Sequence, residues 1–145
     1  MIARCLFDVN ALIALVDPNH VFHDHMHAWW ELHRSSGWAS CSLTLNGALR
    51  VMSQPAYSEH PFSLGELART LRAFQQTTDH EFWPEDLSLL DESRFDLRWV
   101  VGHRQITDVY LLGLAVQRQG VLVTLDTSIP VAAVCEATGS SLVSL

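Results

Sequence analysis

Short apolar runs alternate with longer amphipathic segments along the chain. Residues 3–7 form an apolar run without polar alternation, which predicts a buried strand, and Asp8 follows it directly. Residues 121–126 repeat this form and also end in an aspartate. The sequence predicts three further strands, at 38–42, 80–83 and 141–145.

Between these runs, most segments have apolar residues at helical spacing, which predicts helices. The clearest helix is 107–120, with Thr107 predicted as its cap and Gly120 as its end. Asn10 is a plausible N-cap for a helix over 10–16. The other predicted helices are 20–36 ended by Gly37, 43–54 stopped by Pro55, 63–77, a mixed helical segment up to about residue 101, and a short helix near 130–137.

This alternation of strands and helices predicts an α/β fold with a central parallel sheet and helices on both faces. The 145 residues form one domain, 1–145, since no linker or repeat interrupts them. No apolar run approaches the roughly 18 residues of a membrane span, and the start lacks the features of a signal peptide. Three widely spaced cysteines without a CxxC fit a reducing cytoplasm.

The charged residues of the chain limit the classes of protein to which it can belong. A net charge of −7 argues against bulk electrostatic coating of nucleic acid, although a local basic groove remains compatible with it. The chain has no lysine, so its nine cations are all arginines. Haloacid-dehalogenase phosphatases and response-regulator receiver domains both use a lysine beside their aspartate, and the sequence therefore excludes both.

Three aspartates are predicted to meet at one edge of the sheet. Asp8 and Asp126 follow strands, where ligands bind in open parallel sheets, and Asp108 lies in the first turn of a helix. Each alone reads as a cap or turn residue, but together they repel one another unless a cation neutralises them. An oxygen-only cluster suits Mg²⁺ or Mn²⁺, and such ions support nuclease chemistry.

Two other patterns offer alternative chemistry. The triplet Asp126-Thr127-Ser128 is similar to that of aspartic proteases, but those enzymes need an all-β scaffold. His20, His23 and His27 share one helical face, where a zinc site competes with a hydrated polar turn.

Several segments together resemble the PIN-domain ribonucleases of the VapC toxin family. They are FDVNALIALVDPNHVFH, LTLNGALRVMSQPAY, HEFW and HRQITDVYLLGLAVQRQGVLVTLD, which span about residues 3–126 in the family's order. The resemblance implies a PIN-like three-layer sandwich. It also implies that Asp8, Asp108 and Asp126 are the catalytic, metal-binding residues.

The resemblance extends to neighbouring polar residues and contains one departure. The positions around the acidic residues, or those that would contact substrate, are Asn10, Thr44, Asn46, Arg50, Arg104 and Thr124. Many PIN domains carry a glutamate where this chain has Leu45 or Asn46, and Ile129 stands where some relatives have a further acid. We expect one well-held Mg²⁺, with Mn²⁺ as a substitute.

The resemblance finally implies a biological role. It predicts a type II toxin–antitoxin toxin that cleaves RNA, works in the cytoplasm, forms a homodimer and is blocked by a VapB-type antitoxin. Arg94, Arg98, His103 and Arg104 offer contacts to phosphate, whereas Arg50 fits either a structural role or antitoxin docking. The alternative is a degenerate PIN domain that only binds RNA or a protein partner.

Overall fold

The computed structural model describes residues 3–145, which form a five-stranded sheet and its helical cover. The strands are β1 (Cys5–Phe7), β2 (Trp38–Ser40), β3 (His80–Phe82), β4 (Val121–Thr124) and β5 (Leu142–Ser144). The helices are α1 (Val9–Val16), α2 (His23–His33), α3 (Ser42–Met52), α4 (Leu64–Thr77) and α5 (Ile106–Gln117). Short 3-10 turns lie at Arg34–Ser36, Leu97–Trp99, His103–Gln105, Val131–Ala133 and Gly139–Ser141.

All pairings between these strands are parallel, in the order β3-β2-β1-β4-β5. The central strand β1 pairs Leu6 with Ala39 of β2 and with Leu122 of β4. Each strand therefore needs a crossover, and the helices supply most of them. The predicted PIN-like α/β fold with a parallel sheet is confirmed.

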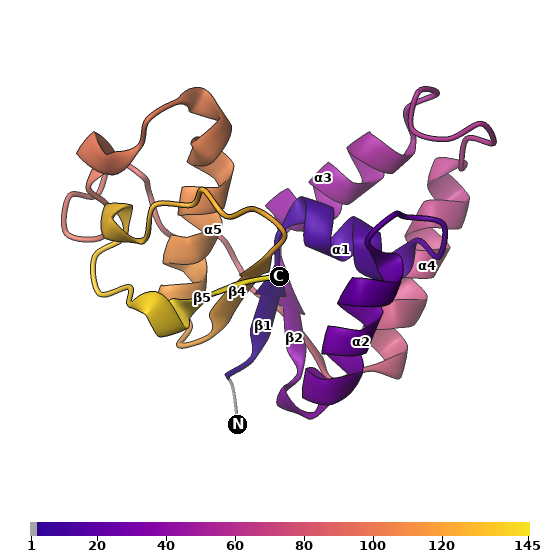
Figure 1. The fold of residues 1–145 in the computed structure, drawn as a ribbon, viewed down its shortest axis with the longest axis horizontal. Helices are drawn as coiled ribbons and strands as arrows, with labels where there is room; N and C mark the ends of the chain where they lie inside the picture. Colours follow the sequence, from indigo (N-terminus) through magenta and orange to yellow (C-terminus); the bar gives the residue numbers. More distant parts are fainter. Residues whose placement is uncertain (1–2) are drawn as a thin grey trace.

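The sheet is buried on both faces because neighbouring residues of a strand point to opposite sides. Cys5 and Phe7 belong to one core cluster, together with residues of α1, α2, α3 and α4. Leu6 belongs to a second cluster, with α5 and the segments that flank it. Figure 1 shows α1 to α4 gathered on one side of the strands and α5 on the other.

The close packing of α3 on α1 depends on a glycine. A Cβ added at Gly47 would lie 2.5 Å from Cγ2 of Val9, so no larger residue fits there without a shift. Gly47 stands one residue after Asn46, and Val9 directly follows Asp8. This contact brings the first turns of both helices to the end of β1.

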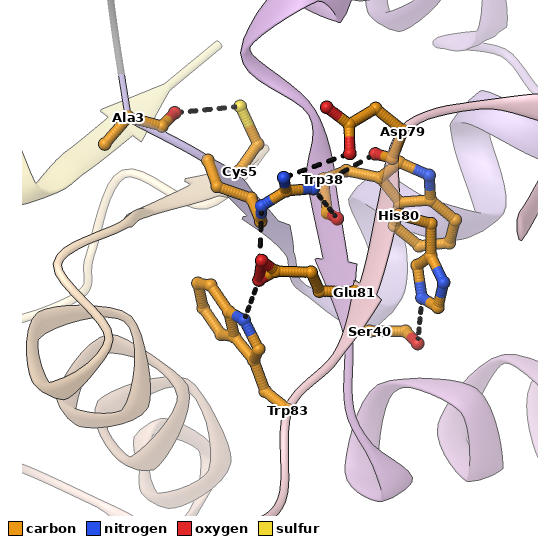
Figure 2. Close-up of polar contacts among 9 residues, drawn as sticks. Ala3, Cys5, Trp38, Ser40, Asp79, His80, Glu81 and Trp83 are labelled. Carbon is orange, nitrogen blue, oxygen red and sulfur yellow. Dashed lines mark hydrogen bonds and ion pairs between the residues drawn. The ribbon is translucent and has the colours of Figure 1, made fainter.

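The edge formed by the starts of the parallel strands, called the amino edge below, is held by Arg4. Its guanidinium pairs with Asp79 at 3.0 Å and Glu81 at 3.4 Å, and it donates to the carbonyl oxygens of Trp38 and Asp79 at 3.0 and 3.2 Å. Figure 2 shows these partners, and Trp83 donating to Glu81 from the neighbouring loop. Acidic side chains at this edge thus have a protein cation.

The segment after β3 differs from the prediction. A helix up to about residue 101 is wrong, since only Leu97–Trp99 forms a 3-10 turn there. Asp91 accepts from the backbone and hydroxyl of Ser93, and Asp96 accepts from the backbone of Arg98. Such local bonds from a side chain to nearby backbone compete with helical hydrogen bonds. Arg94 and Arg98 therefore do not share a helix face.

Several predicted helix ends also need correction. The N-cap of α1 is Asp8 rather than Asn10, and α5 begins after Gln105 rather than at Thr107. At its other end, α5 stops at Gln117, and Gln119 rather than Gly120 takes the left-handed conformation at φ 58°.

The two segments predicted at 20–36 and 130–137 are less helical than expected. The first contains α2 followed by the 3-10 turn Arg34–Ser36, and Gly37 ends it as predicted. The second holds only the 3-10 turn Val131–Ala133. Within residues 3–145, no helix combines the length and apolar character needed to cross a membrane.

Candidate active site

Asp8 directly follows β1 and is the N-cap residue of α1. Its Oδ1 accepts the backbone N–H of Ala11 at 2.8 Å, which is a normal N-cap bond. Its Oδ2 accepts the hydroxyl of Thr124, the last residue of β4. The side chain is buried, with 4% of the residue exposed, and this burial raises the pKa of the carboxyl despite both bonds. Asp8 is therefore both a helix cap and a buried acid.

Thr124 and Ser128 place Asp126 beside Asp8. Thr124 is fully buried, and its hydroxyl oxygen accepts the backbone N–H of Asp126 at 2.9 Å while donating to Asp8. Oδ1 of Asp126 accepts the N–H and the hydroxyl of Ser128, at 2.8 and 2.7 Å. These bonds hold the pKa of Asp126 below its usual value. Asp126 is thus kept ionised.

Asp108 lies in the first turn of α5, and the charges of Asp8 and Asp126 act on its carboxyl group. Burial, followed by the charges of Asp8 and Asp126, raises the pKa of Asp108 from 3.8 to about 7. Within residues 3–145, no hydrogen bond or ion pair reaches its carboxylate. The three aspartates therefore influence one another electrostatically; Asp8, Asp108 and Asp126 are together called the carboxyl edge below.

The donor types at the carboxyl edge fit a hard divalent cation. All three groups are carboxylates, and Mg²⁺ and Mn²⁺ prefer oxygen ligands. The repulsion that Asp108 experiences is the kind that a cation relieves. Among residues 3–145, however, no three His, Cys, Asp or Glu side chains stand close enough to form a ready-made metal cage. The donor atoms at the carboxyl edge therefore suit Mg²⁺ or Mn²⁺, but these side chains are not already placed close enough together to coordinate the ion.

The other polar residues singled out in the sequence lie in different settings. Thr44 is buried in the capping box of α3, where its hydroxyl bonds the backbone of Cys41 in both directions. Asn10 is exposed in the first turn of α1 and Asn46 is exposed in the second turn of α3, whereas Leu45 packs against the core. Arg50 and Arg104 are exposed, as are Arg69 and Arg72 on α4, and within residues 3–145 no acidic side chain pairs with any of these arginines.

Several other arginine and histidine side chains have local partners. Arg94 and Arg98 pair with Asp91 and Asp96 at 3.8 and 2.8 Å. Among the histidines, Nδ1 of His23 lies 2.8 Å from the carbonyl oxygen of Ala14 and Nε2 of His27 lies 3.7 Å from Glu31. Nδ1 of His20 accepts the N–H of Phe22 at 3.0 Å.

Sequence reasoning overlooked Ser128 and Gln105. In the sequence, the triplet that contains Ser128 is similar to the aspartic protease pattern. An aspartate two residues before a serine is also a common turn signal, and that signal predicts the contact seen here. Gln105 carried no signal, because its contacts join segments that are distant in sequence. Its Nε2 donates to the carbonyl oxygen of Ser128 at 3.0 Å, and its Oε1 accepts the N–H of Val101 at 2.9 Å.

Known proteins resemble this chain over most of its length. Ribonuclease VapC44 of Mycobacterium tuberculosis is 43% identical over 142 residues, which cover 98% of this chain and 99% of that protein. Ribonuclease VapC38 of the same organism is 37% identical over 124 residues, 86% of each chain. No family model matches the sequence.

Two solved structures share the fold. The crystal structure of PAE2754 from Pyrobaculum aerophilum has a TM-score of 0.56 and 23% identity, and the match covers 97% of this chain and 83% of that one. VapBC2 from Rickettsia felis, bound to a DNA fragment from their promoter, has a TM-score of 0.57 and 16% identity, over 87% and 89% of the two chains.

Proposed function

Because this chain belongs to the VapC family of ribonucleases, we propose that it is an endoribonuclease that hydrolyses RNA phosphodiesters with a bound Mg²⁺. The observation that supports this most directly is the carboxyl edge. Burial, followed by the charges of Asp8 and Asp126, raises the pKa of Asp108, and no cationic side chain within residues 3–145 pairs with any of the three. Asp8 is buried, Asp108 is partly buried and Asp126 is exposed. Burying Asp8 and Asp108 without a compensating charge is unfavourable, and a bound cation would offset that cost.

The three aspartates of the carboxyl edge are held in different ways. Asp8 and Asp126 are fixed by Thr124 and Ser128, whereas Asp108 has no such bond and can reorient towards an ion. A bound Mg²⁺ or Mn²⁺ supplies activation of water and neutralisation of phosphate charge. Burial and the charges of Asp8 and Asp126 raise the pKa of Asp108 to about 7, and a cation held by these carboxylates would favour its ionised form.

Arg50 and Arg104 are among the exposed arginines that can contact the RNA backbone. Arg50 and Arg104 are exposed, and within residues 3–145 no carboxylate pairs with either of them. Exposed arginines bind phosphate oxygens and position a strand without reading its sequence. Arg94 and Arg98 are less suited to this role because their guanidinium groups pair with acids.

The proposal includes the biological setting of the family. The chain acts as the toxin of a type II toxin–antitoxin pair in the cytoplasm, forms a homodimer and is blocked by a VapB-type antitoxin. The likeness in fold to VapBC2 supports a partner of this kind. Light scattering of the purified chain, alone and after mixing with a VapB-type antitoxin, measures both assemblies. A chain that stays monomeric and does not bind the antitoxin would contradict them.

The test of catalysis is cleavage of total bacterial RNA by the purified, antitoxin-free chain. We expect discrete fragments with Mg²⁺ or Mn²⁺, and intact RNA with chelator or with Asp108→Asn. Asp24→Asn is the matched control, since Asp24 is exposed in the first turn of a different helix. Equal cleavage by Asp108→Asn and the unchanged chain would overturn the assignment of the site.

The second candidate is a degenerate PIN domain that binds RNA or a protein without cutting. Leu45 and Asn46 favour it, because neither supplies the acid found there in many PIN domains, and so does the lack of a preset metal cage within residues 3–145. A binder leaves RNA intact under every condition and keeps its RNA affinity when Asp108 becomes Asn. A nuclease loses cleavage in that variant.

A further inference from the structure

We propose that a second copy of this chain docks on an apolar surface beside the start of α5. This inference rests on the proposed function, because it names the surface through which the proposed homodimer forms. Within residues 3–145, eleven large apolar residues are exposed, and five of them fall between residues 90 and 106. These five are Leu90, Leu97, Trp99, Val101 and Ile106, called the apolar surface below. Exposed apolar residues that gather in this way mark interaction sites.

The apolar surface combines a hollow with side chains that stand out beside it. Three of its five residues line a hollow of about 340 Å³, and the other two, Trp99 and Val101, each directly adjoin Val100, which also lines it. Leu90 is 83% exposed and Val101 is 91% exposed, so both side chains project into solvent. In a two-fold dimer, the same patch of each copy meets its equivalent on the other. The projecting side chains of one copy can then fill the hollow of its partner.

The charges around the apolar surface favour a second copy over RNA. Residues 86–106 contain four acidic residues and three arginines, a net charge of −1, whereas the rest of the chain carries −6. Two copies of so acidic a chain therefore repel each other least through this segment. A second hollow shares Leu90 and Leu97 with the first, and Glu92, Asp96 and Arg98 line it. Because both signs of charge border the apolar surface, each copy can place them opposite their complements on the other, whereas the acids disfavour phosphate.

The segment that carries the apolar surface is fixed before a partner binds. The N–H of Asp96 donates to the carbonyl oxygen of Ala133 at 2.9 Å, and the N–H of Val101 donates to Oε1 of Gln105 at 2.9 Å. A surface that is already ordered loses less conformational entropy on association.

The same segment places the second copy next to the carboxyl edge. Ile106 lies two residues before Asp108 in the first turn of α5. Gln105 donates to the carbonyl oxygen of Ser128 at 3.0 Å, two residues after Asp126. A copy seated on the apolar surface therefore packs beside the segments that carry two of the three aspartates.

The experiment is sedimentation equilibrium of the full chain and its variants, without RNA or metal. We expect the unchanged chain to dimerise, and Leu90→Glu and Val101→Glu each to raise the dimer dissociation constant by about 100-fold. The reason is that a charge in an apolar contact weakens binding by about tenfold, and a two-fold interface contains each substitution twice.

The matched control is Leu32→Glu, which should dimerise as the unchanged chain does. Leu32 is 79% exposed, close to the 83% of Leu90. It lies on α2, on the opposite side of the sheet from α5 (Figure 1). Thermal unfolding of each variant checks that the fold is kept.

The outcomes separate this inference from the proposed function. A dimer that persists in folded Leu90→Glu and Val101→Glu overturns the role of the apolar surface alone. An equal loss of dimer in Leu32→Glu also overturns it, because any added charge would then suffice. A chain that stays monomeric at every soluble concentration overturns both the apolar surface and the homodimer, and loss of antitoxin binding in Leu90→Glu of such a monomer assigns the surface to the antitoxin instead. RNA cleavage is measured separately, so its absence overturns the nuclease and leaves the dimer standing.

Discussion

The two edges of the sheet carry acidic residues in different circumstances. At the amino edge, Asp79 and Glu81 share the guanidinium of Arg4, which lies 3.0 and 3.4 Å from them. At the carboxyl edge, Asp8, Asp108 and Asp126 have no such partner within residues 3–145, and the pKa of Asp108 rises to about 7. Acidic residues thus form ion pairs with a protein cation at the amino edge, whereas within residues 3–145 those of the carboxyl edge have no such cation.

The largest effect should follow from changing Asp8, which has two functions. Asp8→Asn keeps an oxygen for the N–H of Ala11 but removes the charge, so we expect Mg²⁺ affinity to fall more than about 100-fold with little loss of stability. Asp8→Ala should lose the same affinity and, in addition, about 1 kcal/mol of unfolding free energy. Calorimetry and urea unfolding measure the two quantities. Equal stability of both variants would show that the cap contributes nothing.

At the amino edge, the expected effect concerns stability alone. Arg4→Gln leaves Asp79 and Glu81 without their cation and weakens the bonds to two backbone carbonyls, so unfolding free energy should fall by about 2 kcal/mol. RNA cleavage per folded molecule should stay unchanged. A loss of cleavage without loss of stability would mean that the two edges are coupled.

Asp108→Asn should stabilise the chain in the presence of chelator. Because folding raises the pKa of Asp108 to about 7, the native state holds this proton more tightly than the unfolded chain, and stability falls as pH rises from about 4 to about 7. The asparagine variant lacks this loss. We expect it to be more stable by about 1–2 kcal/mol at pH 8, allowing for partial exposure, and equal at pH 4. A constant difference across that range would contradict the raised pKa.

A smaller gain should follow from adding an acid to the carboxyl edge. Asn46 is exposed on α3, so Asn46→Glu should raise Mn²⁺ affinity by roughly fivefold through added negative charge. Leu45→Glu is the comparison variant, since Leu45 packs against the core and a charge there should lower stability instead. Higher Mn²⁺ affinity in Leu45→Glu than in Asn46→Glu would place the missing acid at 45.

The sequence predicted the sheet well because its signals are local. β1 and β4 are unbroken apolar runs that end beside an aspartate, and burial on both faces leaves few other ways to place such runs. The position of Asp108 in the first turn of α5 was also recognisable, since apolar residues and a long helix follow it. These elements were enough to predict that the three carboxylates meet.

The irregular segments were harder to predict for a physical reason. The turns around Asp91 and Asp96 are set by side chains that bond nearby backbone, and a helix remained compatible with the apolar spacing. Gln105 forms hydrogen bonds with both Val101 and Ser128. Because Ser128 lies 23 residues after Gln105, no local sequence pattern predicts this contact. The details that orient Asp126 therefore required the three-dimensional structure.

The bond between Asp8 and the first turn of α1 also makes a natural spectroscopic probe. The amide proton of Ala11 rests on Oδ1 of the same carboxylate whose Oδ2 faces Thr124, so it senses any change in charge on Asp8. Its NMR resonance should move when a cation occupies the carboxyl edge. Occupancy of the site can thus be followed from inside the fold, with no substrate present.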